Sequence, residues 1–120
     1  MIGRTYAQPL LQALLLGERF EPPRALHAGL LLEDGSEVEA PEYRRVPVSF
    51  TANRDGTVTN AEDLLWPRAE RDWGRITEVA IFDARTGGNV VVTEPVNQAA
   101  EARELFTGRI RAGRFRARME

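Results

Sequence analysis

The chain has 120 residues and a formal net charge of −2, and its 42% hydrophobic and 28% charged content is typical of one soluble globular domain. This charge gives no support for a nucleic-acid partner, and the absence of cysteine excludes disulfides and thiolate metal sites. The longest apolar run is too short to span a membrane, and no basic stretch followed by an apolar core marks a signal peptide.

The first predicted element is a helix over Thr5–Leu16, with Thr5 as its cap, Pro9 in or near its first turn and Gly17 as its stop. Its leucines recur at the spacing of one apolar face: Leu10, Leu11, Leu14 and Leu15. The pattern favours a helix that covers one end of a sheet. The alternative is an arm that docks on a neighbouring subunit, in which case Leu11 and Leu15 are candidate contacts.

A strand is predicted over Ala25–Leu32, after the break at Glu21-Pro22-Pro23, and Asp34-Gly35 then indicates a turn. One face of this strand carries Leu26, Ala28, Leu30 and Leu32. His27 lies inside the strand, and we expect a structural histidine whose hydrogen bonds are satisfied.

The stretch Glu33–Glu42 holds five acidic residues and no basic one. We expect a solvated loop. A docking surface for the arginines of a partner is the alternative.

Arg45–Thr51 alternates between apolar and polar residues, which predicts a strand with Val46, Val48 and Phe50 towards a core. Pro47 indicates an edge position, because proline cannot donate a ladder hydrogen bond. A turn over Asn53–Gly56 and a short strand over Thr57–Thr59 should follow. Trp66 and Trp73 then lie in or near apolar segments and are predicted to be core or subunit contacts.

The centre of the fold is predicted at Arg75–Val92, where two β-branched runs flank the turn Asp83–Asn89. The first run is apolar on both faces apart from Glu78, as in a central strand covered on both sides. We expect Ile81 and Val91 to be buried in adjacent antiparallel strands.

The second strand of this hairpin should end at Glu94-Pro95, and Asn97–Glu104 should form a loop or one short helical turn. Two last strands are predicted over Leu105–Ile110 and Arg114–Met119. In the second, Phe115, Ala117 and Met119 alternate with an arginine ladder formed by Arg114, Arg116 and Arg118. The preferred interpretation of this ladder is the solvated face of an edge strand. The alternative is a contact with an acidic protein surface, such as the Glu33–Glu42 loop of a neighbouring copy, or with nucleic acid.

Together these elements predict a mainly β domain, an antiparallel β-sandwich or barrel-like fold with a short N-terminal helix. It should be one domain over 1–120, with a helix or arm at 1–17, a β core at 25–94 and C-terminal strands at 95–120. Because a chain of this size buries only a modest core, we also expect a homo-oligomer, with a trimer preferred.

No catalytic, metal or cofactor site is predicted. The single histidine, His27, has no partner at metal-ligand spacing, and Gly87-Gly88 fits a hairpin turn better than a phosphate loop. No serine lies in a nucleophile-elbow pattern. We therefore do not expect an enzyme.

The order of motifs resembles a family of small bacteriophage virion proteins, often labelled tail fibre-like. The motifs that carry the resemblance are Gly35-Ser36-Glu37-Val38, Tyr43–Phe50, Leu65-Trp66-Pro67, Asp72-Trp73-Gly74, Ile76–Asp83 and Gly87-Gly88-Asn89. The resemblance implies a structural protein of the virion, assembled in the host cytoplasm. It covers nearly the whole chain and is firmest over Tyr43–Val92.

Two structural roles follow from this resemblance. The first is a capsid decoration, or cement, protein that binds the outer shell through the major capsid protein. The second is a tail or tail-fibre component that binds tail proteins and helps attachment to the host. Sequence favours decoration, because the chain lacks the long repeats or coiled-coil shaft of a fibre. Candidate interface residues in either role are Arg114, Arg116, Arg118, Trp66, Trp73, Leu11 and Leu15.

Overall fold

A computed structural model describes residues 1–102 and 106–118, and for 97–102 it describes the backbone alone. The elements are α1 (Arg4–Leu16), β1 (Leu26–Leu32), β2 (Val46–Val48), β3 (Phe50–Ala52), β4 (Val58–Asn60), β5 (Leu64–Leu65), β6 (Gly74–Phe82), β7 (Val90–Ala102), β8 (Arg109–Ile110) and β9 (Arg116–Ala117). The helix and the strands lie close to the predicted positions as far as Val92.

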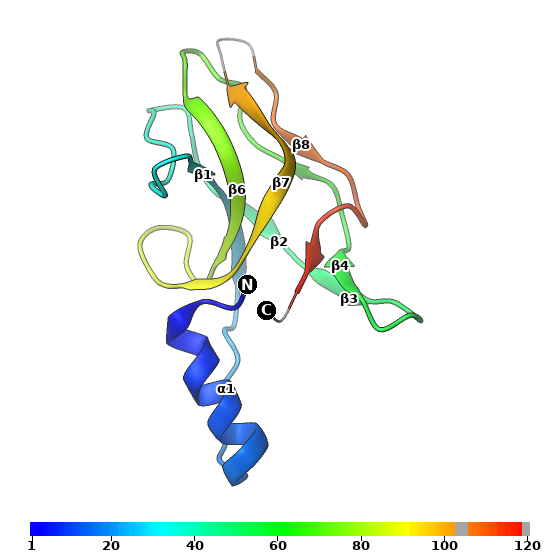
Figure 1. Cartoon of the computed structure of the whole chain (residues 1–120). Coiled ribbons are helices and arrows are strands. Elements are labelled where there is room, and N and C mark those ends of the chain that lie inside the picture. Colours follow the sequence, from blue (N-terminus) through cyan, green and yellow to red (C-terminus); the bar gives the residue numbers. More distant parts are fainter. Residues whose placement is uncertain (103–105, 119–120) are drawn as a thin grey trace.

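The main body is a four-stranded antiparallel sheet in the order β2-β1-β6-β7 (Figure 1). β6 is buried on both faces: Val79 and Ile81 enter one hydrophobic cluster, while Ala80 and Phe82 enter a second, smaller one. This confirms the central strand predicted from its unbroken apolar run. β2 lies at the sheet edge, as Pro47 predicts.

Two smaller sheets, β3-β4-β9 and β5-β8, complete the fold. The larger cluster joins residues of the main sheet, such as Leu30 and Ile81, to Leu64, Trp66 and Phe115 from the smaller sheets and their flanks. The mainly β antiparallel fold with one short helix is confirmed. In the described part of the chain the sheets do not close into a barrel.

Both tryptophans lie in the core. Trp66 is 2% exposed, and its indole N–H donates to the Ala28 carbonyl at 3.1 Å. Trp73 is 5% exposed and donates to Glu42 Oε2 at 2.9 Å. Burial alone would raise the pKa of Glu42, but the hydrogen bonds from the Glu70 N–H and from Trp73 outweigh it and lower that pKa to about 2. The sequence predicts that the tryptophans are either core residues or subunit contacts, and both are core residues.

The acidic stretch is less solvated than expected, because Glu37 is bound inside the chain. Arg45 donates two hydrogen bonds to the Glu37 carboxylate, from Nε and from Nη2, both at 2.9 Å. Tyr43 donates its hydroxyl to Glu37 Oε2 at 2.6 Å, and burial together with this bond raises the pKa of Tyr43. Gly29 makes room for this arrangement, since a Cβ there would lie 2.6 Å from Glu37 Oε2.

Arg45 also ties this stretch to the central hairpin. Its Nη1 donates to the carbonyls of Ala84 and Gly87 at 2.8 Å each, and its guanidinium carbon lies 3.5 Å from the centre of the Phe82 ring. One arginine thus holds the hairpin turn, the acidic stretch and an aromatic ring together.

Several strand boundaries differ from the prediction. Arg45–Thr51 divides at Ser49 into β2 and β3, which belong to different sheets. Ile81 is buried and lies in a strand adjacent and antiparallel to that of Val91, as predicted, but its own partner is Val92, next to a register shift between Ile81 and Phe82. The predicted burial of Val91 is wrong. Val92 is 5% exposed, whereas Val91 is only half-buried.

β7 continues through Pro95 to Ala102, so the predicted end at Glu94-Pro95 and the loop or helical turn over residues 97–102 are wrong. Proline is tolerated because β7 is the edge strand of this sheet, where a missing N–H breaks no ladder bond. The predicted boundary between a β core ending at 94 and C-terminal strands beginning at 95 therefore falls inside one strand.

The last two strands are shorter than predicted, at two residues each. Of the predicted ranges, residues 103–105 and 119–120, which include Leu105 and Met119, lie outside the described residues.

Candidate partner-binding surfaces

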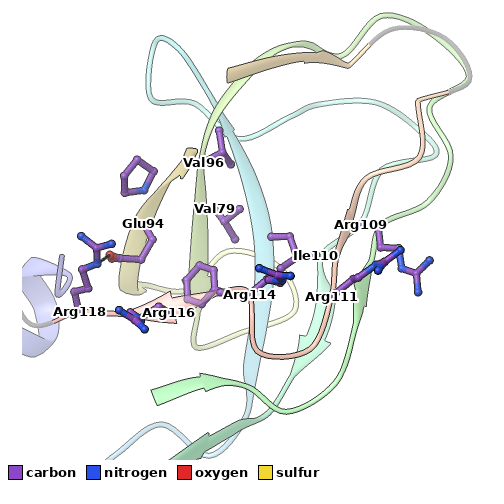
Figure 2. A pocket seen from close by; sticks show the side chains of 11 residues that line it. Val79, Glu94, Val96, Arg109, Ile110, Arg111, Arg114, Arg116 and Arg118 are labelled. Atoms are coloured by element: carbon purple, nitrogen blue, oxygen red, sulfur yellow. Dashed lines mark ion pairs between the residues drawn. The ribbon is translucent and has the colours of Figure 1, made fainter. Parts of the chain in front are cut away.

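An open groove of about 620 Å³ lies between β7 and the segment Arg109–Arg118, in which the turn at Ala112-Gly113 joins β8 to β9. β8 pairs with β5, whereas β9 pairs with β4. Figure 2 shows arginine side chains in a band along one side of it, with apolar side chains between this band and β7. The band comprises Arg109, Arg111, Arg114, Arg116 and Arg118. The apolar floor comprises Val79, Val96, Ile110 and Phe115. We call this feature the arginine groove.

The predicted arginine ladder supplies three of the five arginines of the band. Phe115 is 4% exposed and its ring lies 5.9 Å from that of Phe50, so it anchors β9 on the core. Ala117 is half-buried on the same face, while Arg114, Arg116 and Arg118 are exposed. The predicted alternation holds over the described residues although the strand itself is short.

Asn60, a residue that sequence reasoning missed, holds the turn between β8 and β9 in place. Its side chain is 1% exposed; Nδ2 donates to the carbonyls of Glu62 at 2.8 Å and Arg111 at 3.1 Å, and Oδ1 accepts from the Phe115 N–H at 2.9 Å. An amide can donate and accept at once, so one buried side chain satisfies three backbone groups. No local pattern identifies this role, because two of its three partners, Arg111 and Phe115, lie 51 and 55 residues further along the chain.

Ion pairs occupy the two ends of the band. Arg109 donates to Asp63 at 2.7 Å, and this bond, helped by the Ala112 N–H, lowers the pKa of Asp63. At the other end, Arg118 Nε lies 3.8 Å from Glu94, which is 7% exposed and also lies 3.5 Å from Met1 N. Between them, the side chains of Arg111, Arg114 and Arg116 form no ion pair with the described residues.

Sequence reasoning also left out Arg109 and Arg111. The signal was present, because arginines recur at positions 109, 111, 114, 116 and 118. Only the turn at Ala112-Gly113, which folds β8 back towards β9, brings the two groups to one groove.

The second surface is α1, which projects away from the sheets (Figure 1). No residue of the helix is buried, and Leu11, Leu14 and Leu15 are 55%, 69% and 74% exposed. Only its first turn is attached to the body: the Gly3 N–H donates to the Val91 carbonyl at 2.7 Å, and Tyr6 donates to Asp83 at 2.7 Å. The expectation that the helix covers one end of a sheet is therefore wrong.

The helix ends follow the prediction in part. Gly17 ends the helix in the left-handed conformation, as expected. The N-cap residue is Gly3 rather than Thr5, without a side-chain cap, and Pro9 lies inside the helix.

The described residues contain no group of three or more side chains suited to bind a metal ion. His27 is half-buried on β1, and its Nδ1 has no hydrogen-bond partner among them, so the expected full satisfaction of this histidine is wrong. Among these residues no helix has the length and apolar character needed to cross a membrane.

Comparison with protein families matches the chain to a family model described as "Podophage GP4 fiber I protein gp80", over residues 2–117. The matched range includes α1, all three sheets and the arginine groove apart from Arg118. Comparison with curated proteins gives no match.

Proposed function

The chain belongs to the family of the podophage GP4 fiber I protein gp80, and on this premise we propose that it is a structural subunit of a fibre carried by a bacteriophage virion. The observation that carries the proposal is the family match over residues 2–117, which also confirms the resemblance to a small phage virion protein family. Sequence alone favours capsid decoration over a tail fibre. The family description supports the fibre reading better, and the role is structural rather than enzymatic.

The dimensions of the chain fit one module of a fibre rather than a whole fibre. The molecule measures 49 × 30 × 22 Å along its principal axes, and its sheets form one body with a projecting helix. Such a module needs contacts to other subunits, and α1 and the arginine groove are suited to provide them.

Copies of the chain would associate through α1. At about 100° per residue, Ala7, Leu10, Leu11, Leu14 and Leu15 form one apolar stripe. The helix carries no charged side chain between Thr5 and Gly17 that would oppose burial. Because the stripe is wider than the seam of a two-stranded coiled coil, a bundle of three helices buries more of it, and a trimer is preferred.

The oligomer is tested by sedimentation of the purified chain and of a Leu11→Gln/Leu15→Gln variant. The expected result is an oligomer for the natural sequence and a monomer for the variant. Leu16→Gln is the matched control, because Leu16 is 68% exposed but lies on the opposite side of the helix. A monomeric natural chain would contradict self-association, and an oligomeric double variant would exclude the stripe as its contact.

The place in the virion is tested by electron microscopy of labelled particles. A short epitope inserted in the exposed turn Asn53–Gly56 lies outside both candidate surfaces. Gold-labelled antibody should gather on fibres. Label spread over the capsid shell would favour the decoration protein instead and overturn the fibre proposal.

A further inference from the structure

We propose that the arginine groove is the docking site for an extended acidic peptide segment of another virion protein, with carboxylates at alternate positions and apolar side chains between them. The inference rests on the proposed function, because a fibre module must be held by a neighbouring protein. It adds the chemistry of that partner and the strand that receives it.

Charge is the first argument. The chain as a whole has a formal charge of −2, yet five arginines line one groove, with Glu94 as the acidic side chain in its described lining. Glu94 already lies beside Arg118, and Asp63 binds Arg109. Arg111, Arg114 and Arg116 form no ion pair with the described residues, although the charges of Arg111 and Arg116 help to lower the pKa of Asp63 and of Asp55. Such a concentration of positive charge attracts an anionic partner.

Spacing is the second argument. Alternate residues of a strand point to one face and recur about every 6.6 Å. An extended peptide beside β9 has the same repeat, so carboxylates at every second position lie opposite Arg114 and Arg116. Guanidinium groups bind carboxylates with two parallel hydrogen bonds, which makes this match more specific than charge alone.

The backbone of β9 is free to receive such a strand. β9 is the edge of its sheet, with β4 as its neighbour. The Phe115 carbonyl accepts from the Asn60 N–H and its own N–H donates to the Asn60 side chain, so both groups point towards β4. In an antiparallel ladder the next residue directs its N–H and C=O the other way, so those of Arg116 face outwards. On the other side of the groove, Pro95 of β7 has no N–H to donate. We therefore expect the peptide to pair with β9 rather than with β7.

The apolar floor distinguishes a peptide from other polyanions. Val79 and Phe115 form its buried part, and an adjoining recess of about 100 Å³ extends towards Leu30 and Trp66. In a strand added to β9, the residues between the carboxylates point to the face that carries Phe115. One branched aliphatic side chain there can enter the recess, whereas a nucleic acid or an acidic polysaccharide has no such group.

The acidic stretch of a second copy is not this partner. Its best segment, Glu37-Val38-Glu39, has the required alternation of acid and apolar residues. However, Glu37 is bound by Arg45 and Tyr43, and Val38 is 3% exposed. Docking this segment on a neighbour would first break those contacts.

The test is fluorescence anisotropy with the full chain and a labelled, end-blocked peptide, Glu-Val-Glu-Val-Glu. We expect saturable binding that weakens as ionic strength rises. An Arg114→Ser/Arg116→Ser variant should bind at least about fivefold more weakly, since each cross-strand charge pair contributes modestly. Arg54→Ser/Arg85→Ser is the matched control, because both arginines are exposed outside the groove and the charge change is the same.

A second peptide, Glu-Ser-Glu-Ser-Glu, tests the apolar floor and should bind more weakly than the first. Absence of binding, or equal loss in the groove variant and its control, would overturn the proposal. Equal binding of both peptides, with displacement by an oligonucleotide or a sulfated polysaccharide, would overturn it in favour of a general polyanion site. Thermal unfolding shows that each variant is folded. The assay contains no virion, so its outcome is independent of whether the label gathers on fibres.

Discussion

Replacing Asn60 by alanine should loosen the segment Arg109–Arg118, which carries the arginine band. The substitution removes the two hydrogen bonds donated to the Glu62 and Arg111 carbonyls, each of net value about 0.5–1.5 kcal/mol. It also leaves the buried Phe115 N–H without an acceptor, which costs about 1–3 kcal/mol. The free energy of unfolding should therefore fall by about 2–6 kcal/mol.

The change is large enough to see by thermal unfolding. With an unfolding entropy of about 2 cal/mol/K per residue, the 120-residue chain should lose about 8–25 °C in Tm. Asn53→Ala is the control, because Asn53 is exposed and its side chain bonds only within its own turn and to Thr59. It should change the free energy of unfolding by less than about 1 kcal/mol.

An Asn60→Leu variant separates hydrogen bonding from packing, because leucine fills a similar volume without any polar group. It should be destabilised about as much as Asn60→Ala. Natural stability in Asn60→Leu would refute the reasoning, because the side chain would then act by filling space. A Tm within about 2 °C of the natural chain for both variants would show that the three hydrogen bonds contribute nothing.

Three further outcomes are expected. Ile81→Ala should lower the free energy of unfolding by about 2–5 kcal/mol in urea, because Ile81 is fully buried; a loss below about 0.5 kcal/mol would contradict its central position. The pKa of Glu42 is lowered from 4.5 to about 2, so the folded chain binds this proton less readily than the unfolded chain, and the stability due to Glu42 should be present above pH 4.5 and disappear towards pH 2. Glu42→Gln should therefore lose less stability over that interval, and equal losses would argue against the lowered pKa. Gly88→Ala should reduce Tm through a strain of about 1–3 kcal/mol, since Gly88 has φ +70° and a Cβ there would meet Asp83; an unchanged Tm would contradict the hairpin geometry.

The sequence predicted correctly those elements whose hydrophobic or turn pattern lies within their own residues. The two-sided apolar run of β6, the single proline of β2 and the turns at Asp34-Gly35 and Asn53–Gly56 are all found as predicted. Side-chain periodicity and turn chemistry depend on neighbours a few residues away, so they can be read before the chain is folded.

The predicted ends of strands are wrong where the position of a strand in its sheet matters more than its amino-acid composition. The sequence around Pro95 predicts the end of a strand. At the edge of a sheet, however, the missing N–H of proline costs little, and β7 continues. Likewise the pairing of Ile81 with Val92 depends on a register shift that no apolar pattern reveals. For α1, the spacing of the leucines revealed an apolar face, but the sequence did not reveal that this face is exposed to solvent.

The sequence by itself determined the class of the fold, the central hairpin, the family resemblance and the alternation of arginine and apolar residues at the C-terminal end. Tertiary structure alone decided that Arg109 and Arg111 join Arg114, Arg116 and Arg118 around one groove, that Val79 and Val96 contribute to its floor, and that Asn60 holds the turn between β8 and β9. The physical reason is range: propensity and periodicity act between near neighbours, whereas a groove is made by hydrogen bonds and packing between residues tens of positions apart, whose partners are chosen only when the sheets assemble.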